Sequence, residues 1–185
     1  MTQPIAGTAA RKTTRRIRII DGVMDALMSQ SVFGIIGHGN SESAVAHKMH
    51  SEILKSLTCL HRELDTNAPE ALVDKRAREC LLWEGDINTT INHIQFLGAQ
   101  HRPDFIVQID GIRIAIELKR GSDGSCVRNA LGQCIVYASQ FDFNCCVIVD
   151  TTRDKKLNRA YGEGTTEALM LGRLWDNFNI RIGVV

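Results

Sequence analysis

Long apolar runs are missing from this 185-residue sequence. No stretch approaches the roughly eighteen consecutive apolar residues that a membrane-spanning helix needs, so the sequence predicts no contact with the membrane interior. Hydrophobic residues nevertheless make up 44% of the chain and charged residues 23%. This balance is typical of a soluble folded protein and argues against bulk disorder.

An excess of positive charge is also missing. The 22 Lys and Arg residues are nearly balanced by 21 Asp and Glu residues, which leaves a formal net charge of +1. A chain that binds nucleic acid over its whole surface is usually strongly basic. Any nucleic-acid footprint on this protein is therefore expected to be local.

Paired cysteine motifs are absent as well. The six cysteines form no CxxC pair and no regular spacing, and they lie at Cys59, Cys80, Cys126, Cys134, Cys145 and Cys146. We expect reduced, mostly buried thiols in an intracellular, cytoplasmic protein, since no secretory signal with an apolar core is recognisable. Adjacent residues of a strand point to opposite faces, so Cys145 and Cys146 disfavour an iron–sulfur cluster.

The first 20 residues differ in composition from the rest of the chain. They contain no acidic residue and five basic ones, at Arg11, Lys12, Arg15, Arg16 and Arg18. Three interpretations stand side by side: an arm that binds a phosphate backbone, a mitochondrial transit segment, or a plain solvated terminus. The length suits one domain, so we divide the chain into a basic extension, 1–20, and a single domain, 21–185.

Hydrophobic periodicity predicts a mixed α/β protein. Before residue 100 it indicates helices at 20–29, 40–64 and 71–83, a glycine-rich turn at 33–40 and a strand at 91–97. After residue 100 it indicates two strands at 103–119, a helix at 125–140, a strand at 145–150, a helix at 165–178 and a strand at 180–185. This order implies a central mixed β-sheet flanked by helices.

The segment from Pro103 to Lys119 carries the clearest pattern. Apolar residues alternate on either side of Asp110-Gly111, a pair typical of a two-residue type I′ hairpin turn. Such a turn places Asp104 directly opposite Glu117. The face that these two residues share is predicted to hold Asp104, Ile106, Gln108, Arg113, Ala115, Glu117 and Lys119, while the other face is apolar.

Two carboxylates with side-chain origins roughly 5 Å apart repel each other unless a cation compensates. Mg²⁺ prefers oxygen ligands and keeps several waters, so Asp104, Glu117 and the Leu118 carbonyl would leave positions for water and phosphate. Lys119 would orient or deprotonate the attacking water, while the metal polarises the phosphate. An E-x-K tripeptide alone is common on solvated strands and is weak evidence for a metal site. Here it occurs together with Pro-Asp at the start of the first strand and with a turn that fixes the register, and this combination makes the evidence stronger.

The segment HRPDFIVQIDGIRIAIELKRG resembles the core signature of the PD-(D/E)xK, or restriction-endonuclease-like, nucleases, with Asp104, Glu117 and Lys119 on the motif. The resemblance implies a central mixed sheet with helices on both faces and Mg²⁺-dependent cleavage of phosphodiester bonds, with Mn²⁺ as a substitute metal. On family grounds it favours DNA over RNA as partner. A homo-oligomer is an expectation by analogy alone.

Two further features extend the resemblance. Gln133 and Tyr137 have the Q-x-x-x-Y spacing of RecB-like and lambda-exonuclease-like nucleases, which puts both side chains on one helix face for catalysis and substrate binding. The family also takes a metal ligand from an N-terminal helix. Glu42, at the start of its helix, is favoured for that position, and Glu52 is the alternative.

Basic residues after the E-x-K strand are candidate contacts to a phosphate backbone. We assign Arg120 and Arg128 to substrate binding; the same cluster includes Arg153, Lys155, Lys156 and Arg159. Two alternatives to a nuclease stay open. One is a catalytically silent nucleic-acid-binding or assembly module with the same fold, and the other is a small cysteine-based redox or metal-binding protein.

Overall fold

A computed structural model describes residues 13–32, 41–87, 89–162 and 164–185. Its helices are α1 (Thr14–Leu27), α3 (Glu42–Leu64), α4 (Glu70–Glu79), α5 (Gly124–Tyr137), α6 (Lys156–Ala160) and α7 (Thr166–Phe178). Its strands are β1 (Leu81–Trp83), β2 (Ile94–Phe96), β3 (Ala99–His101), β4 (Phe105–Ile109), β5 (Ile112–Gly121), β6 (Phe143–Asp150) and β7 (Ile180–Val184).

Five strands form one mixed sheet in the order β1-β4-β5-β6-β7. The pairs β1–β4 and β4–β5 are antiparallel, whereas β5–β6 and β6–β7 are parallel. The parallel pairs are linked by crossovers through α5 and through α6 and α7, as parallel strands require. The predicted class, an α/β protein with a mixed sheet between helices, is confirmed.

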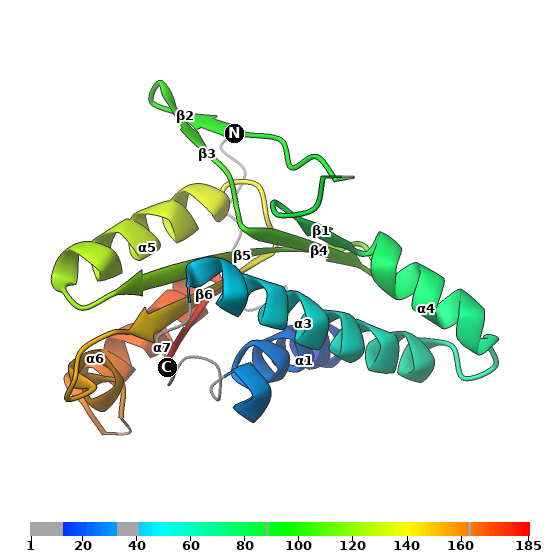
Figure 1. Cartoon of the computed structure of the whole chain (residues 1–185), viewed down its shortest axis with the longest axis horizontal. Coiled ribbons are helices and arrows are strands. Elements are labelled where there is room, and N and C mark those ends of the chain that lie inside the picture. The colour runs from blue at the N-terminus through cyan, green and yellow to red at the C-terminus, as the bar shows by residue number, and fades with distance from the viewer. Residues whose placement is uncertain (1–12, 33–40, 88, 163) are drawn as a thin grey trace.

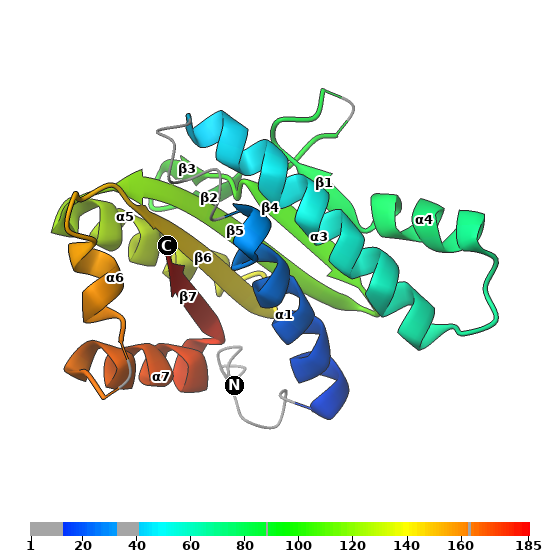
Figure 2. The same cartoon turned by 60° about the horizontal axis from the view of Figure 1, so that its bottom comes forward.

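Helices α1 and α3 cover one face of the sheet (Figure 2). The apolar stripe predicted for α3 is buried in full and consists of Val45, Met49, Ile53, Leu57 and Leu60. It meets alternate residues of the strands, among them Phe105, Ile116 and Val147. This layer is the main hydrophobic core of the protein.

Helix α5 lies against the opposite face (Figure 1). There Tyr137 packs beside Ile106 and Ala115, while Ala130 and Cys134 pack beside Cys146. The charged face that the sequence predicts for the hairpin is thus largely covered, and Glu117 is only 1% exposed. The pattern of the strands alone cannot reveal this cover, because it comes from a helix later in the chain.

The structure corrects two predicted elements. The helix expected over 71–83 ends at Glu79, and Leu81–Trp83 forms the edge strand β1, because pairing with β4 satisfies its backbone. The strand expected over 91–97 is reduced to Ile94–Phe96, which pairs with Ala99–His101 outside the main sheet. The glycine-rich turn predicted at 33–40 lies outside the described residues.

The helix predicted from residue 20 begins earlier, at Thr14, whose preceding residue Thr13 caps it. The division of the chain at residue 20 therefore runs through a helix. The basic residues at the start of α1 form ion pairs: Arg15 with Asp110, Arg16 with Asp142 and Arg18 with Glu63. Three of the five cations assigned to a basic arm thus have carboxylate partners, and the other two lie outside the described residues. None of the described helices is both long and apolar enough to cross a membrane.

Candidate active site

The β4–β5 hairpin sets the geometry of the candidate site. Asp110 and Gly111 have φ angles of 53° and 72°, as a type I′ turn requires at both central positions. The observed register pairs Phe105 with Ile116, so Asp104, one residue before β4, faces Glu117. The predicted hairpin and its register are confirmed.

Four side chains and one backbone N–H group meet at this end of the hairpin. The Leu118 backbone N–H donates to Asp104 Oδ2 at 2.6 Å, where β5 runs beyond the start of β4. Lys119 Nζ lies 2.5 Å from Glu117 Oε1, and the Tyr137 hydroxyl donates to Glu117 Oε2 at 2.9 Å. Both oxygens of the buried Glu117 are therefore held in fixed directions.

The electrostatics of the site show an unrelieved excess of negative charge. Burial, then the nearby charge of Glu117, raises the pKa of Asp104 to about 7, although the Leu118 N–H and Lys119 oppose this. Burial also raises the pKa of Glu117. Burial lowers the pKa of Lys119, but the hydrogen bond and charge of Glu117 outweigh it, so the pKa rises and the ammonium form is favoured. The single ammonium group of Lys119 does not neutralise both carboxylates. A bound divalent cation would neutralise the remaining negative charge.

The side chains of the site can be compared with the ligands that Zn²⁺ and Mg²⁺ prefer. Within the described ranges, no three His, Cys, Asp or Glu side chains converge closely enough to enclose a metal ion by themselves. Zinc held by the side chains of these described residues alone does not fit. Two carboxylates fit Mg²⁺, because this ion keeps several waters. The Leu118 carbonyl faces the same side as the N–H that binds Asp104, since both groups of one strand residue point to the same neighbour.

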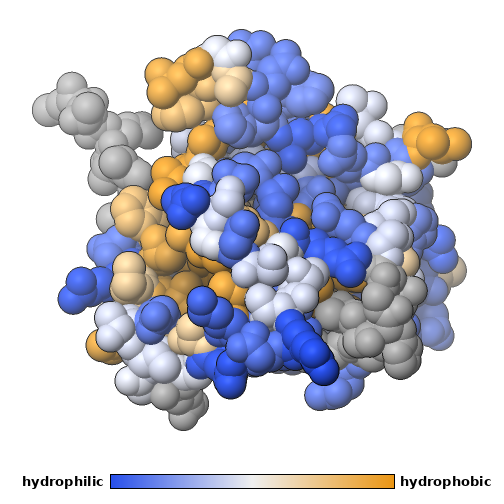
Figure 3. Space-filling model, turned by 60° about the vertical axis from the view of Figure 1, so that its left-hand side comes forward, coloured by the Kyte–Doolittle hydropathy of each residue, from blue (hydrophilic) through white to orange (hydrophobic). Residues whose placement is uncertain are grey.

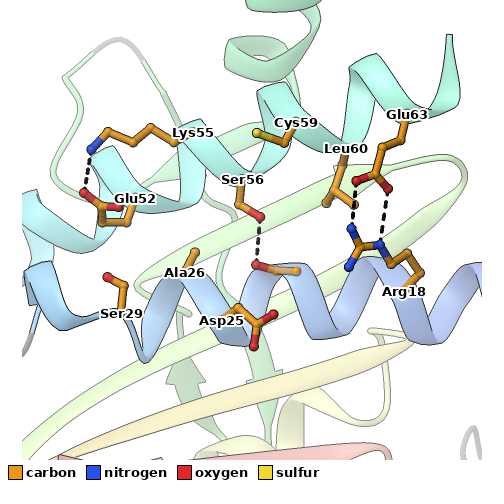
Figure 4. A pocket seen from close by; sticks show the side chains of 11 residues that line it. Arg18, Asp25, Ala26, Ser29, Glu52, Lys55, Ser56, Cys59, Leu60 and Glu63 are labelled. Carbon is orange, nitrogen blue, oxygen red and sulfur yellow. Dashed lines mark hydrogen bonds and ion pairs between the residues drawn. The ribbon is translucent and has the colours of Figure 1, made fainter. Parts of the chain in front are cut away.

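The two helical candidates for a further acidic ligand lie in different places. Glu42 begins α3, and its charge acts on Asp104, Glu117 and Lys119. Glu52 instead lines a cleft between α1 and α3, where its carboxylate lies 2.8 Å from Lys55 Nζ (Figure 4). The hydrogen bond from Lys55 lowers the pKa of Glu52. The structure thus brings Glu42, and not Glu52, near the carboxylate pair; metal ligation by Glu42 stays a prediction.

The Q-x-x-x-Y residues Gln133 and Tyr137 lie on α5, and Tyr137 faces the hairpin. Tyr137 is fully buried and donates to Glu117, an arrangement that does not fit direct contact with a substrate. It acts on the site by orienting that carboxylate. Burial, then the charge of Glu117, raises the pKa of Tyr137, so the hydroxyl keeps its proton and remains a donor. Gln133 is half-buried one helical turn earlier on the same side of α5.

The two arginines predicted to bind substrate are not brought together with the carboxylates. Arg120 is exposed and follows Lys119 in β5, so the alternation of the strand points it to the opposite face. Arg128 lies on α5 nine positions before Tyr137, which is about half a turn away around the helix. It lines a groove between α5, α6 and α7 instead.

A buried aspartate beside the site was not predicted. Asp150 ends β6 opposite Gly121, two residues after Lys119 in β5. Its carboxylate accepts four hydrogen bonds, from the Thr152 N–H and hydroxyl and from the Leu157 and Asn158 N–H groups. The signal available in the sequence was an aspartate that ends an apolar strand and precedes two threonines, which is typical of an Asx turn.

Comparisons with known proteins add little to this geometry. The sequence matches no protein-family model and no curated protein. Among solved structures, the chain is similar to the restriction endonuclease PspGI in complex with substrate DNA, with 12% sequence identity and a TM-score of 0.33. The match covers 90% of this chain and 76% of that one. A likeness at this level carries no argument about activity, so the functional interpretation rests on the site itself.

Proposed function

We propose that this protein is a Mg²⁺-dependent nuclease of the PD-(D/E)xK type that hydrolyses phosphodiester bonds in DNA. One observation carries the proposal: two carboxylates, Asp104 and Glu117, face each other in a largely buried site beside Lys119. Burying two like charges side by side costs free energy when a single ammonium group is their only partner, and proteins tolerate such arrangements chiefly at functional sites. The proposal for DNA rather than RNA rests on the resemblance of the hairpin sequence.

In this proposal Asp104, Glu117 and the Leu118 carbonyl would hold the metal, and Glu42 would add negative charge from α3. A bound divalent cation would polarise the phosphate and lower the pKa of the attacking water. Lys119, held as an ammonium by Glu117, orients that water and stabilises charge on the phosphate oxygens. Tyr137 fixes the Glu117 carboxylate, and Gln133 faces the substrate from α5.

The loop that follows β6 offers a phosphate-binding surface next to the site. The Thr151 N–H donates to the Gly121 carbonyl at 3.0 Å, which ties the loop to the end of β5. Lys155 Nζ donates to the Asp150 carbonyl at 2.7 Å and holds the loop from within. Arg153 and Lys156 are exposed on this anchored segment. We assign these two cations to the backbone of the bound nucleic acid.

The proposal is tested by cleavage of labelled single-stranded, duplex and branched DNA, with RNA as a comparison, in Mg²⁺ or EDTA. Wild-type protein is expected to cut DNA only in Mg²⁺, and Glu117→Ala to lose at least about a thousandfold in rate, since it removes both a metal ligand and the anchor of Lys119. Metal binding without cleavage, or equal rates for the two proteins, would reject the nuclease and favour the silent binding module.

Glu42→Gln and Glu52→Gln provide a matched pair for the same assay, because both change a glutamate of α3 to its neutral isostere. Glu42→Gln is expected to weaken Mg²⁺-dependent cleavage, whereas Glu52→Gln is expected to keep the wild-type rate, because Glu52 is paired with Lys55 in the α1–α3 cleft. The opposite ranking would assign the acidic residue that α3 contributes to Glu52.

The loop is tested through the salt dependence of DNA binding, measured in EDTA so that the proposed reaction does not proceed. The double variant Arg153→Ala/Lys156→Ala is expected to lower the slope of log affinity against log salt by about 2, because each lost phosphate contact removes about one released counter-ion. Arg159→Ala is the control, since Arg159 is already paired with Asp154 at 2.6 Å. Equal slopes for both variants would contradict the assignment.

A further inference from the structure

The face formed by α5, α6 and α7 contains an apolar groove of about 450 Å³. Helices α5 and α7 form its walls, and α6 contributes Leu157 and Ala160. Strands β6 and β7 form the floor through Ile148, Ile182 and Val184. Figure 3 shows apolar side chains gathered in a hollow on this side of the molecule, which is the left side in Figure 1. The groove lies apart from the carboxylates, on the far side of α5 from Tyr137.

The apolar side of α7, which forms one wall of the groove, is largely exposed to solvent. No residue of this 13-residue helix is buried, although Leu171 and Leu174 point into the groove. Met170 is 59% exposed at the rim and Phe178 is 38% exposed further along the same helical stripe. Ile135 continues the stripe of α5 in the same way and is 51% exposed. The apolar band therefore extends along both helices beyond the groove itself.

Two side chains of opposite charge also line the groove. Arg128 lines it from α5 and Glu167 lines it from α7, and both are exposed. Neither side chain forms an ion pair with another residue in the part of the chain that the structure describes. An apolar surface flanked by two unpaired opposite charges is complementary to a copy of itself.

We propose that this groove is the contact surface of a symmetric homodimer. A two-fold axis through the groove would place Arg128 of one copy against Glu167 of the other, twice, because both partners use the same patch in such a contact. The apolar bands on α5 and α7 would then cover one another, with the paired charges at the rim setting the orientation. A band that runs along two helices suits a protein surface better than a small ligand.

Charge reversal provides a test that does not depend on the nuclease proposal. In multi-angle light scattering across a concentration series, the wild-type protein is expected to reach twice the 20.6 kDa of one chain. Arg128→Glu alone and Glu167→Arg alone are each expected to be monomers, with self-association weaker by more than about a hundredfold, since each creates two like-charge contacts. Mixing the two variants is expected to restore the dimer, because every cross-pair is then opposite in charge.

The double variant Arg128→Glu/Glu167→Arg is likewise expected to dimerise with itself. Arg173→Glu is the matched control: it reverses an exposed charge on α7 that does not line the groove, and it should leave the dimer intact. Circular dichroism verifies that each variant is folded. A monomeric wild type at all concentrations, single variants that remain dimers, or a mixture that stays monomeric would each overturn the proposal.

Discussion

Asp104→Asn is expected to abolish Mg²⁺-dependent cleavage and, at the same time, to make the metal-free protein more stable at pH 8. The amide keeps an oxygen that can accept the Leu118 N–H but carries no charge against Glu117. Raising a carboxyl pKa from 3.8 to about 7 corresponds to roughly 4 kcal/mol of stability lost once the group is ionised. The gain on substitution should approach that value at most, because water still reaches this partly exposed group.

The gain in stability from Asp104→Asn is expected to increase with pH. The pKa of Asp104 is higher in the folded than in the unfolded protein, so its ionisation destabilises the fold progressively between about pH 4 and pH 7. Urea unfolding in EDTA should therefore show a large difference between variant and wild type at pH 8 and almost none at pH 4. Mg²⁺ binding by the wild type should strengthen as pH rises to about 7, because the metal needs the ionised carboxylate. Equal stabilities at pH 8 would refute this account of the site.

Asp150→Ala is expected to cause the largest loss of stability, roughly 3–5 kcal/mol, because it leaves four donors without their acceptor. Chemical denaturation at pH 7 measures this loss. Asp154→Ala is a matched control in the same loop. Its side chain is 61% exposed and pairs with Arg159, so the expected change is below about 1 kcal/mol.

Acid should remove the difference in the free energy of unfolding between wild type and Asp150→Ala. Burial raises the pKa of Asp150, but the hydrogen bonds from Thr152, Asn158 and Leu157 together bring it below its ordinary value. A carboxylate with a lowered pKa stabilises the fold fully above its unfolded pKa, and this contribution disappears as pH falls through the folded value. A difference that stayed constant from pH 7 to strongly acidic solution would assign the loss to packing instead of charge.

The hairpin was predictable because its information is local. Alternation along residues 105–118 identifies the strands, and Asp110-Gly111 fixes their register, so the meeting of Asp104 and Glu117 follows from sequence spacing alone. The helix α3 was predictable for the same reason, since its apolar stripe repeats at helical spacing and Ser41 supplies the cap. Neither element needs information from a distant part of the chain.

The remaining features depend on contacts between distant segments. Leu81–Trp83 becomes a strand because β4 offers an open edge, a tertiary effect that outweighs local preference. The spacing of Gln133 and Tyr137 predicts a shared helix face, but it cannot reveal that Tyr137 is buried against Glu117. The groove is likewise invisible in the sequence, because Arg128 and Glu167 come from helices in separate crossovers.

The hairpin also determines which length changes the chain can tolerate during evolution. Asp104 and Glu117 face each other because both lie the same number of residues from the tight turn at Asp110-Gly111. A residue inserted between Ile112 and Glu117 would rotate Glu117 to the α3 face or force a bulge, while Lys119 would turn with it. Insertions before Asp104 or after Gly121 leave this count untouched. Homologous chains that preserve the chemistry should therefore vary in length around the hairpin and hardly at all within it.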